Sequence, residues 1–365
     1  ILLIQPSKAP HSLLGDEYFM FEPLALEYVA ASLSRDHDVR LLDLRIDSDL
    51  QATLDDFAPE VVGITAYTVH VTSALDLCRR IKTTLPGTLT VIGGHHATVR
   101  PEDFCQPAVD LVVAGEGVVP FRDAVRRHEQ HRPLDGIVGL FQVRGDELVG
   151  EPAAAESDLD HLPLPDRTGS ARYRHRYFSE WMKPLATVRT SKGCPFRCTF
   201  CALWRLTNGR YLKREPEKII AELRTIAEPN VFFADDESMI NVKGLDRLAD
   251  LIAEERLQKR YFCYGRSDTI VKHRDLLEKW RSIGLARVFV GVEAFRDEDL
   301  LSINKKSTIA TNEQALRLLA DLGIEAYANF IVRPDFTRDD FRALRRYCRD
   351  LPLTFAGFTV LTPLP

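Results

Sequence analysis

Three cysteines occur close together near the middle of the chain. Cys194, Cys198 and Cys201 follow the spacing C-x3-C-x2-C. Thiolates are soft ligands that suit iron–sulfur clusters and zinc. Structural zinc sites usually close with four ligands, and no second pair of Cys or His follows closely here. Three thiolates leave one iron of a cubane open for a substrate, so the spacing favours an iron–sulfur cluster over zinc.

The other cysteines do not extend this site. Seven cysteines are too few and too unevenly placed for a disulfide scaffold. The four outside the triplet stand singly in apolar or helical surroundings, and we interpret them as ordinary small hydrophobic residues: Cys78, Cys105, Cys263 and Cys348.

The elements that position the triplet alternate between strands and helices. The triplet follows the first of six apolar strand segments, at 186–190, 231–234, 261–264, 287–292, 326–332 and 356–361. Helical patterns lie between and after them, at 216–227, 243–256, 273–283, 297–303, 309–322 and 338–350. The carboxyl ends of such strands form one face, where a site is expected. Periodicity alone does not distinguish an open sheet from a partial barrel.

The first half of the chain alternates in the same way. Strand segments are predicted at 1–5, 39–44, 61–65, 89–92 and 111–114, with helical patterns at 24–33 and 73–82. Runs of Val, Ile and Leu that alternate with helices predict a doubly wound parallel sheet with ligands at its carboxyl edge. Gly93, Gly94 and Gly115 follow two of these strands, where glycine lets a backbone approach a ligand closely. No GxGxxG follows the first strand, which disfavours a dinucleotide site.

These patterns predict an α/β protein with two domains and a seam. We assign residues 1–145 to the first domain, 146–183 to a linker and 184–365 to the second domain. The two prolines of residues 162–165 exclude a helix or a central strand. The chain starts at Ile1 and stops just after the sixth strand, so we expect a fragment trimmed at its C-terminus.

Composition narrows the function classes. The net charge of −5 argues against a nucleic-acid partner. No run reaches the roughly 18 apolar residues of a membrane span, and the N-terminus lacks a secretory signal. Export is therefore unsupported. An oxygen-labile cluster at the three cysteines would need a reducing compartment, so we expect a cytoplasmic protein.

The motif C-x3-C-x-aromatic-C, with Phe200 as the aromatic residue, resembles the cluster motif of the radical S-adenosylmethionine (SAM) superfamily. The resemblance covers about residues 184–365 and implies a partial (β/α)6 barrel. It also implies a [4Fe–4S] cluster on the three cysteines, whose open iron binds the amino and carboxylate groups of SAM.

The same resemblance implies further SAM contacts. Asp235 and Asp236 follow the second strand, where the superfamily binds the methionine amino group. Arg266 follows the third strand and could pair with the methionine carboxylate, and Glu293 ends the fourth and could accept from ribose hydroxyls. Each is also plausible as a solvated charge or a strand cap. Arg333 stands where relatives usually carry Gly, which puts a direct copy of the adenine contacts in doubt.

The first half resembles the N-terminal domain of the cobalamin-dependent radical SAM enzymes over about residues 1–145. The resemblance depends on the two glycine turns and the stretch 21–26. It implies a cobalamin site whose candidate residues follow three strands: Thr65, Tyr67, Thr68, Gly93, Gly94, His95, Gly115 and Glu116. The Asp-x-His-x-x-Gly motif of other cobalamin proteins is absent, so the residue that faces cobalt stays open. Extra N-terminal cysteines are also absent, which disfavours a methylthiotransferase acting on transfer RNA.

Within that family, residues 190–198 and 330–336 look most like the hopanoid C-3 methylases. The resemblance implies a methyltransferase that acts on an unactivated carbon, with a hopanoid as the candidate substrate, using the [4Fe–4S] cluster, SAM and cobalamin. It also implies an electron donor such as flavodoxin or ferredoxin, and a lipid substrate allows peripheral membrane contact. Two alternatives stay open: a cyclase or ring-rearranging enzyme with the same cofactors, and a zinc-stabilised cobalamin sensor without catalysis.

Overall fold

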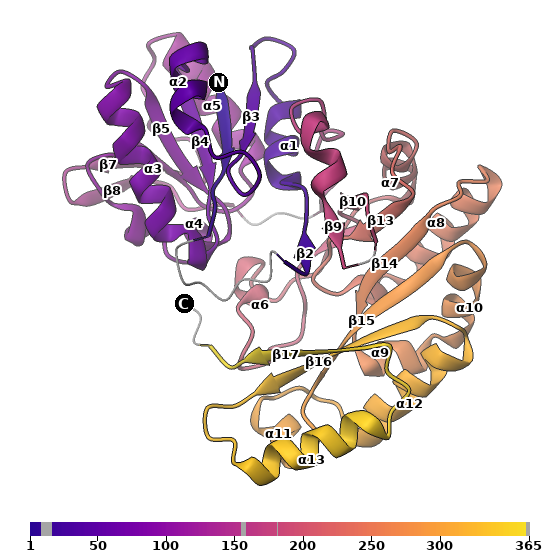
Figure 1. Cartoon of the computed structure of the whole chain (residues 1–365). Coiled ribbons are helices and arrows are strands. Elements are labelled where there is room, and N and C mark those ends of the chain that lie inside the picture. The colour runs from indigo at the N-terminus through magenta and orange to yellow at the C-terminus, as the bar shows by residue number, and fades with distance from the viewer. Residues whose placement is uncertain (9–16, 155–157, 181, 363–365) are drawn as a thin grey trace. The chain divides into compact units, whose positions relative to one another are not determined.

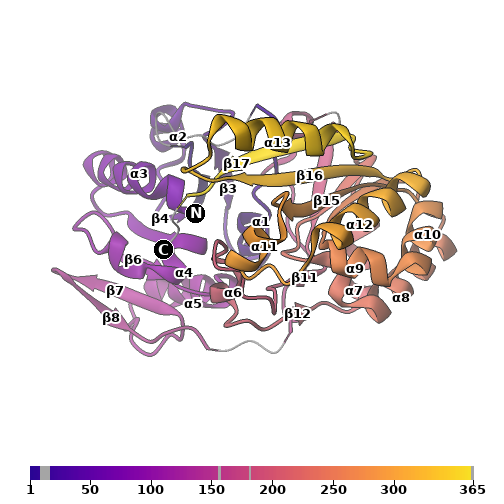
Figure 2. The same cartoon turned by 90° about the horizontal axis from the view of Figure 1, so that it is seen from below.

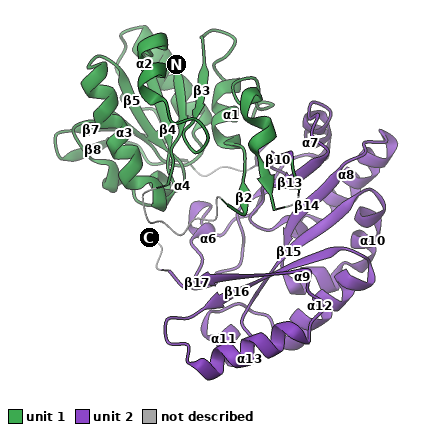
Figure 3. Ribbon diagram, in the orientation of Figure 1, with its two compact units in different colours: residues 1–156, 161–183, 365 green, residues 157–160, 184–364 purple. Residues whose placement is uncertain are grey.

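The computed structural model describes residues 1–8, 17–154, 158–180 and 182–362. The chain forms two compact units (Figure 3). Unit 1 comprises residues 1–156 and 161–183 together with residue 365, and unit 2 comprises residues 157–160 and 184–364. Each unit has its own hydrophobic core, as expected for a domain.

Unit 1 is built on a seven-stranded sheet with the order β3-β1-β4-β5-β6-β7-β8. Its first five strands are parallel, and the last two form an antiparallel hairpin at one edge. Taken in chain order, the parallel strands follow the flavodoxin-like sequence 2-1-3-4-5, whose ligands bind at the carboxyl edge. The strands are β1 (Leu2–Gln5), β3 (Arg40–Asp43), β4 (Val61–Thr65), β5 (Leu89–Gly93), β6 (Leu111–Val113), β7 (Leu140–Arg144) and β8 (Glu147–Gly150).

The helices of unit 1 include some that the sequence analysis did not predict. The expected helices are present as α1 and α3, whereas α2, α4 and α5 had no predicted counterpart (Figure 1). Their bounds are α1 (Leu24–Ala31), α2 (Leu50–Phe57), α3 (Val71–Thr84), α4 (His95–Val99) and α5 (Val118–Glu129), with short 3-10 turns η1 (Thr68–His70), η2 (Pro101–Phe104) and η3 (Ala171–Arg176).

The segment expected as a linker is largely part of unit 1. Residues 147–150 form β8, and Phe178–Ser179 form β9, which pairs with β2 (Phe19–Met20). We call residues 161–180 the arginine strap, because its Arg167 and Arg174 face two fully buried carboxylates, Glu22 and Glu27. Burial, followed by the charge of Glu22, raises the pKa of Glu27 well above its ordinary value.

The rest of the strap also docks by hydrogen bonds. The hydroxyl of Ser170 donates to Glu27 at 2.5 Å, and that of Tyr177 donates to Asp43 at 3.2 Å. The local sequence pattern did not predict this docking. The segment is rich in prolines and charges, and its partners lie more than 130 residues away in the sequence.

Unit 2 is a six-stranded parallel sheet in which every strand pairs with the previous strand of the series, in the order β10-β13-β14-β15-β16-β17. Within the described residues β10 does not pair with β17, so the strands do not form a closed barrel. This confirms the predicted architecture. The strands are β10 (Leu185–Val188), β13 (Asn230–Phe233), β14 (Arg260–Gly265), β15 (Leu285–Glu293), β16 (Glu325–Val332) and β17 (Phe355–Val360).

The longer helices of unit 2 cover one face of this sheet (Figure 2). They bury Val231, Val288, Val290, Ala326 and Ala328, which alternate along the strands with residues of the opposite face. The helices are α6 (Leu203–Leu206), α7 (Pro216–Leu223), α8 (Val242–Glu254), α9 (Ser267–Lys272), α10 (Arg274–Ser282), α11 (Asp297–Ser302), α12 (Ile309–Asp321) and α13 (Arg338–Arg349), and a small hairpin joins β11 (Ser191–Lys192) to β12 (Leu212–Lys213).

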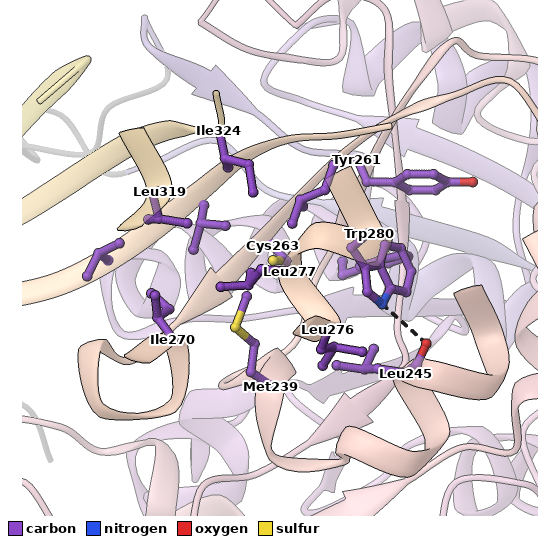
Figure 4. Close-up of a cluster of buried hydrophobic side chains, with 14 of the residues drawn as sticks. Met239, Leu245, Tyr261, Cys263, Ile270, Leu276, Leu277, Trp280, Leu319 and Ile324 are labelled. Atoms are coloured by element: carbon purple, nitrogen blue, oxygen red, sulfur yellow. Dashed lines mark hydrogen bonds between the residues drawn. The ribbon is translucent and has the colours of Figure 1, made fainter. Parts of the chain in front are cut away.

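Trp280 anchors the core beneath these helices (Figure 4). Its ring meets Tyr261 at 5.5 Å, and its indole N–H donates to the carbonyl oxygen of Leu245 at 3.2 Å. Buried indole nitrogens need such a partner. Throughout the described residues, every helix is too short or too polar to cross a bilayer.

Candidate functional site

The three cysteines lie on the loop that follows β10 and β11, at the carboxyl edge of the partial barrel. Cys198 is buried, and Cys194 and Cys201 are half-buried; none forms a disulfide. The loop folds back on itself, with the Cys201 amide donating to the Cys198 carbonyl oxygen at 3.2 Å. It is also tied to the segment after α11, because Thr199 donates to the carbonyl oxygen of Ile303 at 3.0 Å.

Asp235 and Asp236 hold the start of this loop. Asp235 accepts the amides of Thr190 and Ser191, each at 2.8 Å, and the Thr190 hydroxyl at 2.6 Å. Asp236 accepts the amide of Gly193 at 2.6 Å. The two carboxylates that sequence analysis assigned to the methionine amino group are therefore bonded to the backbone that leads into Cys194.

Gly193 is required at the entry to the loop. Its φ is +89°, and a Cβ there would lie 2.2 Å from the carbonyl oxygen of Arg210. Only glycine meets both conditions, because it adopts positive φ freely and carries no side chain.

Arg266 lies against the cysteine loop. Its guanidinium stacks over the ring of Phe196 at 3.6 Å and has one nitrogen 3.9 Å from the Cys198 sulfur. Its other nitrogens donate to Asp268 at 2.9 Å and to the carbonyl oxygen of Lys305 at 2.7 Å. The Arg266 guanidinium, which sequence analysis assigned to the methionine carboxylate, therefore has protein partners. It also brings a positive charge close to the thiols.

Burial raises the pKa of the Cys194 thiol to about 11 and also raises that of Cys201. A cysteine ligand binds metal as the thiolate. In the described residues, no three His, Cys, Asp or Glu side chains converge on the position of one ion. The fit to a cluster therefore depends on donor chemistry: three unoxidised thiols on one loop beside the Arg266 guanidinium, as thiolate ligation of iron requires.

Glu293 ends β15 at a φ of +67° and forms a buried ion pair with Lys305 at 2.7 Å. Strained backbone at the end of a strand is typical of functional sites. The pair occupies the room above Gly291, because a Cβ there would lie 2.3 Å from the Glu293 carboxylate and 2.7 Å from the Lys305 ammonium. Sequence analysis named Glu293 but missed Lys305, whose setting Asn304-Lys305-Lys306 looks like exposed surface.

Glu237 is a second residue that sequence analysis left unassigned. Its carboxylate is 2% exposed and accepts from the Met239 amide at 3.2 Å and the Thr269 hydroxyl at 3.1 Å. Burial raises its pKa to about 7. This carboxylate lies just past the end of β13 and is partly protonated near neutral pH, so it can exchange a proton there.

In unit 1 the candidate residues lie on three neighbouring loops at the carboxyl ends of β4, β5 and β6. Tyr67 is half exposed and meets the ring of His95 at 4.8 Å. The Thr98 hydroxyl joins the other two loops, because it donates to the carbonyl oxygen of Gly94 at 2.8 Å and accepts from the Gly115 amide at 3.0 Å.

Backbone conformation and steric contacts require glycine at two of these positions. Gly94 has a φ of +106°, and a Cβ there would lie 2.8 Å from the Ala66 nitrogen; Gly115 has a φ of +90°, and a Cβ would lie 2.5 Å from the Cβ of Ala153. The remaining candidates Thr65, Thr68, Gly93 and Glu116 belong to the same three strand ends.

Next to these loops, His70 has an unsatisfied buried nitrogen. It is 2% exposed, and its Nδ1 accepts from the Tyr67 amide at 3.4 Å. Burial, followed by the charge of Arg45, lowers its pKa to about 4, so Nε2 carries the proton of the neutral ring. Among the described residues Nε2 has no hydrogen-bond partner. A buried donor without a partner is costly, and an acceptor on a bound cofactor fits it.

Comparisons with known proteins connect both sites to one family. The B12 binding domain matches residues 12–125, and the Radical SAM superfamily matches residues 188–348. The hopanoid C-3 methylase of Methylococcus capsulatus is 32% identical over 98% of this chain and 70% of its own. The chain belongs to the cobalamin-dependent radical SAM enzymes. It is therefore an enzyme, which sets aside the zinc-stabilised sensor, and methyl transfer is the reaction class that its relatives support best.

A second relative has different chemistry in its name. The anaerobic magnesium-protoporphyrin IX monomethyl ester cyclase of Cereibacter sphaeroides is 29% identical over 87% of this chain and 53% of its own. Among solved structures, the radical SAM methyltransferase TsrM from Kitasatospora setae superposes with a TM-score of 0.80 at 21% identity, covering 98% of this chain and 74% of its own. That likeness shows that this radical SAM enzyme shares the two-domain fold.

Arg333, which the sequence analysis found at a position where relatives usually carry Gly, is held by ion pairs. Arg333 follows β16 and pairs with Asp335 at 2.8 Å and with Asp299 at 3.1 Å. These contacts hold the loop after β16 to α11 and keep the guanidinium among carboxylates.

Proposed function

We propose that this enzyme transfers a methyl group to an unactivated carbon of a hopanoid lipid. The observation that carries the proposal is the identity of 32% over 98% of the chain with a hopanoid C-3 methylase. Both cofactor domains are included in that match. A hopanoid carbon bonded only to carbon and hydrogen resists acid–base chemistry, which is why a radical route suits it.

In this proposal Cys194, Cys198 and Cys201 hold the [4Fe–4S] cluster, which with SAM supplies the radical, while cobalamin supplies the methyl group. Arg266 keeps positive charge beside the thiols and orients the loop through Phe196. Glu293 and Lys305 form the neighbouring SAM surface, with Lys305 neutralising the carboxylate where it accepts from hydroxyls. Asp235 and Asp236 act as positioning residues for the loop.

For cobalamin we propose the three loops of unit 1, with Tyr67 and His95 as an exposed ring surface and His70 donating from Nε2. Thr65, Thr68, Gly93, Gly94, Gly115 and Glu116 line the same edge. The glycines keep the backbone accessible, as a broad planar ligand requires.

We further propose a cytoplasmic location with a flavodoxin or ferredoxin as the one-electron donor. Reduced thiols need a reducing compartment, and all seven cysteines are free. A lipid acceptor would bring the enzyme to a membrane surface by peripheral contact.

The test uses anaerobically reconstituted enzyme with SAM labelled in its methyl group and a hopanoid acceptor. We expect a product heavier by one methylene that carries the label. A product that has lost hydrogens or gained oxygen would instead support a cyclase reaction, the chemistry named for the second relative. Deoxyadenosine formation without any labelled lipid would contradict the hopanoid assignment.

A further inference from the structure

Four aromatic side chains form a row across four adjacent strands of unit 2. Tyr264, Phe289, Tyr327 and Phe355 are register partners on β14, β15, β16 and β17. Neighbouring ring centroids lie 5.0, 5.0 and 6.0 Å apart. Rings at these separations touch, and we call these four residues the aromatic row.

The aromatic row lies on the face of the sheet opposite the helices. Its residues alternate with Val288, Val290, Ala326 and Ala328, which are buried against the helices, and successive side chains of a strand point to opposite faces. The four rings are half-buried, whereas the residues between them are fully buried. The row therefore keeps aromatic surface that the helical core does not use.

An ion pair between a buried arginine and a partly exposed glutamate closes the amino side of the row. Arg287 and Glu325 precede Phe289 and Tyr327 by two residues and pair at 2.8 Å, with Arg287 2% exposed. The Arg287 guanidinium lies over the ring of Phe355 at 4.6 Å. Both charges are paired with each other, so this layer offers no free charge to a ligand.

The carboxyl side of the row is formed by small and polar residues. Gly291, Asn329 and Gly357 are register partners one layer above the rings. Asn329 donates to the Thr359 hydroxyl at 3.1 Å. Glycine at two positions of this layer leaves the space to neighbouring side chains. A Cβ at Gly291 would lie 2.3 Å from the Glu293 carboxylate, and a Cβ at Gly357 would lie 2.6 Å from the ring of Tyr327.

The aromatic row is continuous with the proposed SAM surface. Arg266 lies two residues beyond Tyr264 on the same strand path. Glu293 lies beyond a bulge that shifts the register of β15, and its carboxylate occupies the room above Gly291, in the layer next to the rings. Glu293 is held by Lys305. A molecule resting on the rings therefore lies next to the residues proposed to hold SAM, where hydrogen abstraction takes place.

We propose that the aromatic row binds the hydrocarbon body of the methyl acceptor and restricts it to uncharged, flat polycyclic compounds. This inference rests on the proposed methyl transfer and adds the residues that select the acceptor. Ring faces attract apolar, planar surface, and both ion pairs on this face are already satisfied. A charged acceptor would lose its hydration without gaining a partner. The Asn329–Thr359 pair accommodates one isolated polar group.

The test measures binding and turnover separately on the holoenzyme. Equilibrium binding of a radiolabelled pentacyclic hydrocarbon in detergent is measured without reductant, and KM is measured with reductant. Removing a ring by Phe289→Ala or Tyr327→Ala should weaken binding and raise KM about tenfold, because each ring contributes apolar contact surface to the acceptor.

Two control variants should bind the hydrocarbon like wild type. Tyr327→Phe retains the ring and should bind like wild type. Phe358→Ala removes an exposed ring on the opposite face of β17 and should also have no effect. If the alanine variants melt like wild type and still bind the hydrocarbon normally, the inference is wrong. It is also wrong if a carboxylated derivative of the acceptor binds as tightly as the hydrocarbon.

The two proposals fail in different ways. If wild type binds the hydrocarbon through the row but methylates no hopanoid, the proposed function fails and the inference survives. If methylation proceeds and the row variants leave KM unchanged, the inference fails alone.

Discussion

At the scale of single residues, the cysteine triplet is the feature whose chemistry the sequence revealed most directly. Spacing and residue type alone predicted Cys194, Cys198 and Cys201 as the cluster ligands. What surrounds them was harder to see, because it depends on contacts between distant segments. Arg266 reaches the loop from β14, and Lys305 contributes its carbonyl oxygen from beyond α11.

Replacing one thiol should remove the cluster. Serine is a harder ligand than cysteine, so Cys198→Ser is expected to lose most of the iron and acid-labile sulfide bound per chain after anaerobic reconstitution. Cys105→Ser, at a free and half-buried thiol in unit 1, is the matched control and should keep the wild-type iron content. An unchanged iron content in Cys198→Ser would refute the assignment.

The buried His70 predicts a pH dependence of stability. Its folded pKa of about 4 lies below the ordinary value of 6.5, so the unfolded chain binds the proton more tightly. The contribution of His70 to the free energy of unfolding is fully present above about pH 6.5. It is lost as the pH drops toward 4, which lowers the stability by at most about 3 kcal/mol.

Denaturant unfolding of wild type and His70→Gln between pH 7 and pH 4 measures this contribution. Glutamine can still accept from the Tyr67 amide but does not titrate, so its stability should fall less steeply in this range. Parallel curves for the two proteins would show that His70 does not contribute.

At the scale of elements, the loop after β10 depends on the strand beside it. Asp235 accepts three hydrogen bonds from Thr190 and Ser191, and it comes from the end of β13, the neighbour of β10 in the sheet. We therefore expect Asp235→Ala to destabilise unit 2 by about 2–4 kcal/mol and to speed iron loss to a chelator.

Asp235→Asn should retain most of the stability, because its amide oxygen still accepts both backbone N–H groups. Asp250 lies on α8 and forms an exposed pair with Lys279 of α10, so Asp250→Ala should change stability by less than about 1 kcal/mol. Equal iron release from all three variants and wild type would contradict a positioning role for Asp235.

The strands of unit 2 were predictable because their apolar runs are long and end at clear breaks. The hairpin of β7 and β8 was not, because Gln142, Arg144 and Glu147 give it a polar character at the exposed edge of the sheet. Lys305 was missed for a related reason: nothing in its local sequence indicates that Glu293, twelve residues earlier, draws its ammonium into a buried pair.

At the scale of the whole molecule, the arginine strap means that unit 1 extends past the point where its sheet ends. A fragment of residues 1–145 lacks β8 and leaves Glu22 and Glu27 without Arg167 and Arg174. Breaking a buried ion pair by removing one partner costs about 3–5 kcal/mol. We expect a fragment of residues 1–183 to resist proteolysis better than one of residues 1–145.

A control tests whether the unpaired carboxylates cause the lability of the shorter fragment. Neutralising both carboxylates, as Glu22→Gln with Glu27→Gln, should recover part of the protease resistance of the shorter fragment. If the substitutions leave it as labile as before, the loss comes from the missing strand and the buried charges are not responsible.

The separation of Glu22 and Arg174 along the chain also determines how late during translation their ion pair can form. The two residues are 152 positions apart, which at 5–20 residues per second corresponds to about 8–30 s of translation. For that interval the nascent chain carries carboxylates that it cannot bury at low cost, so we expect the first unit to complete its fold only after Arg174 has been made. The barrel strands behave differently, since each one emerges next to a partner that is already made.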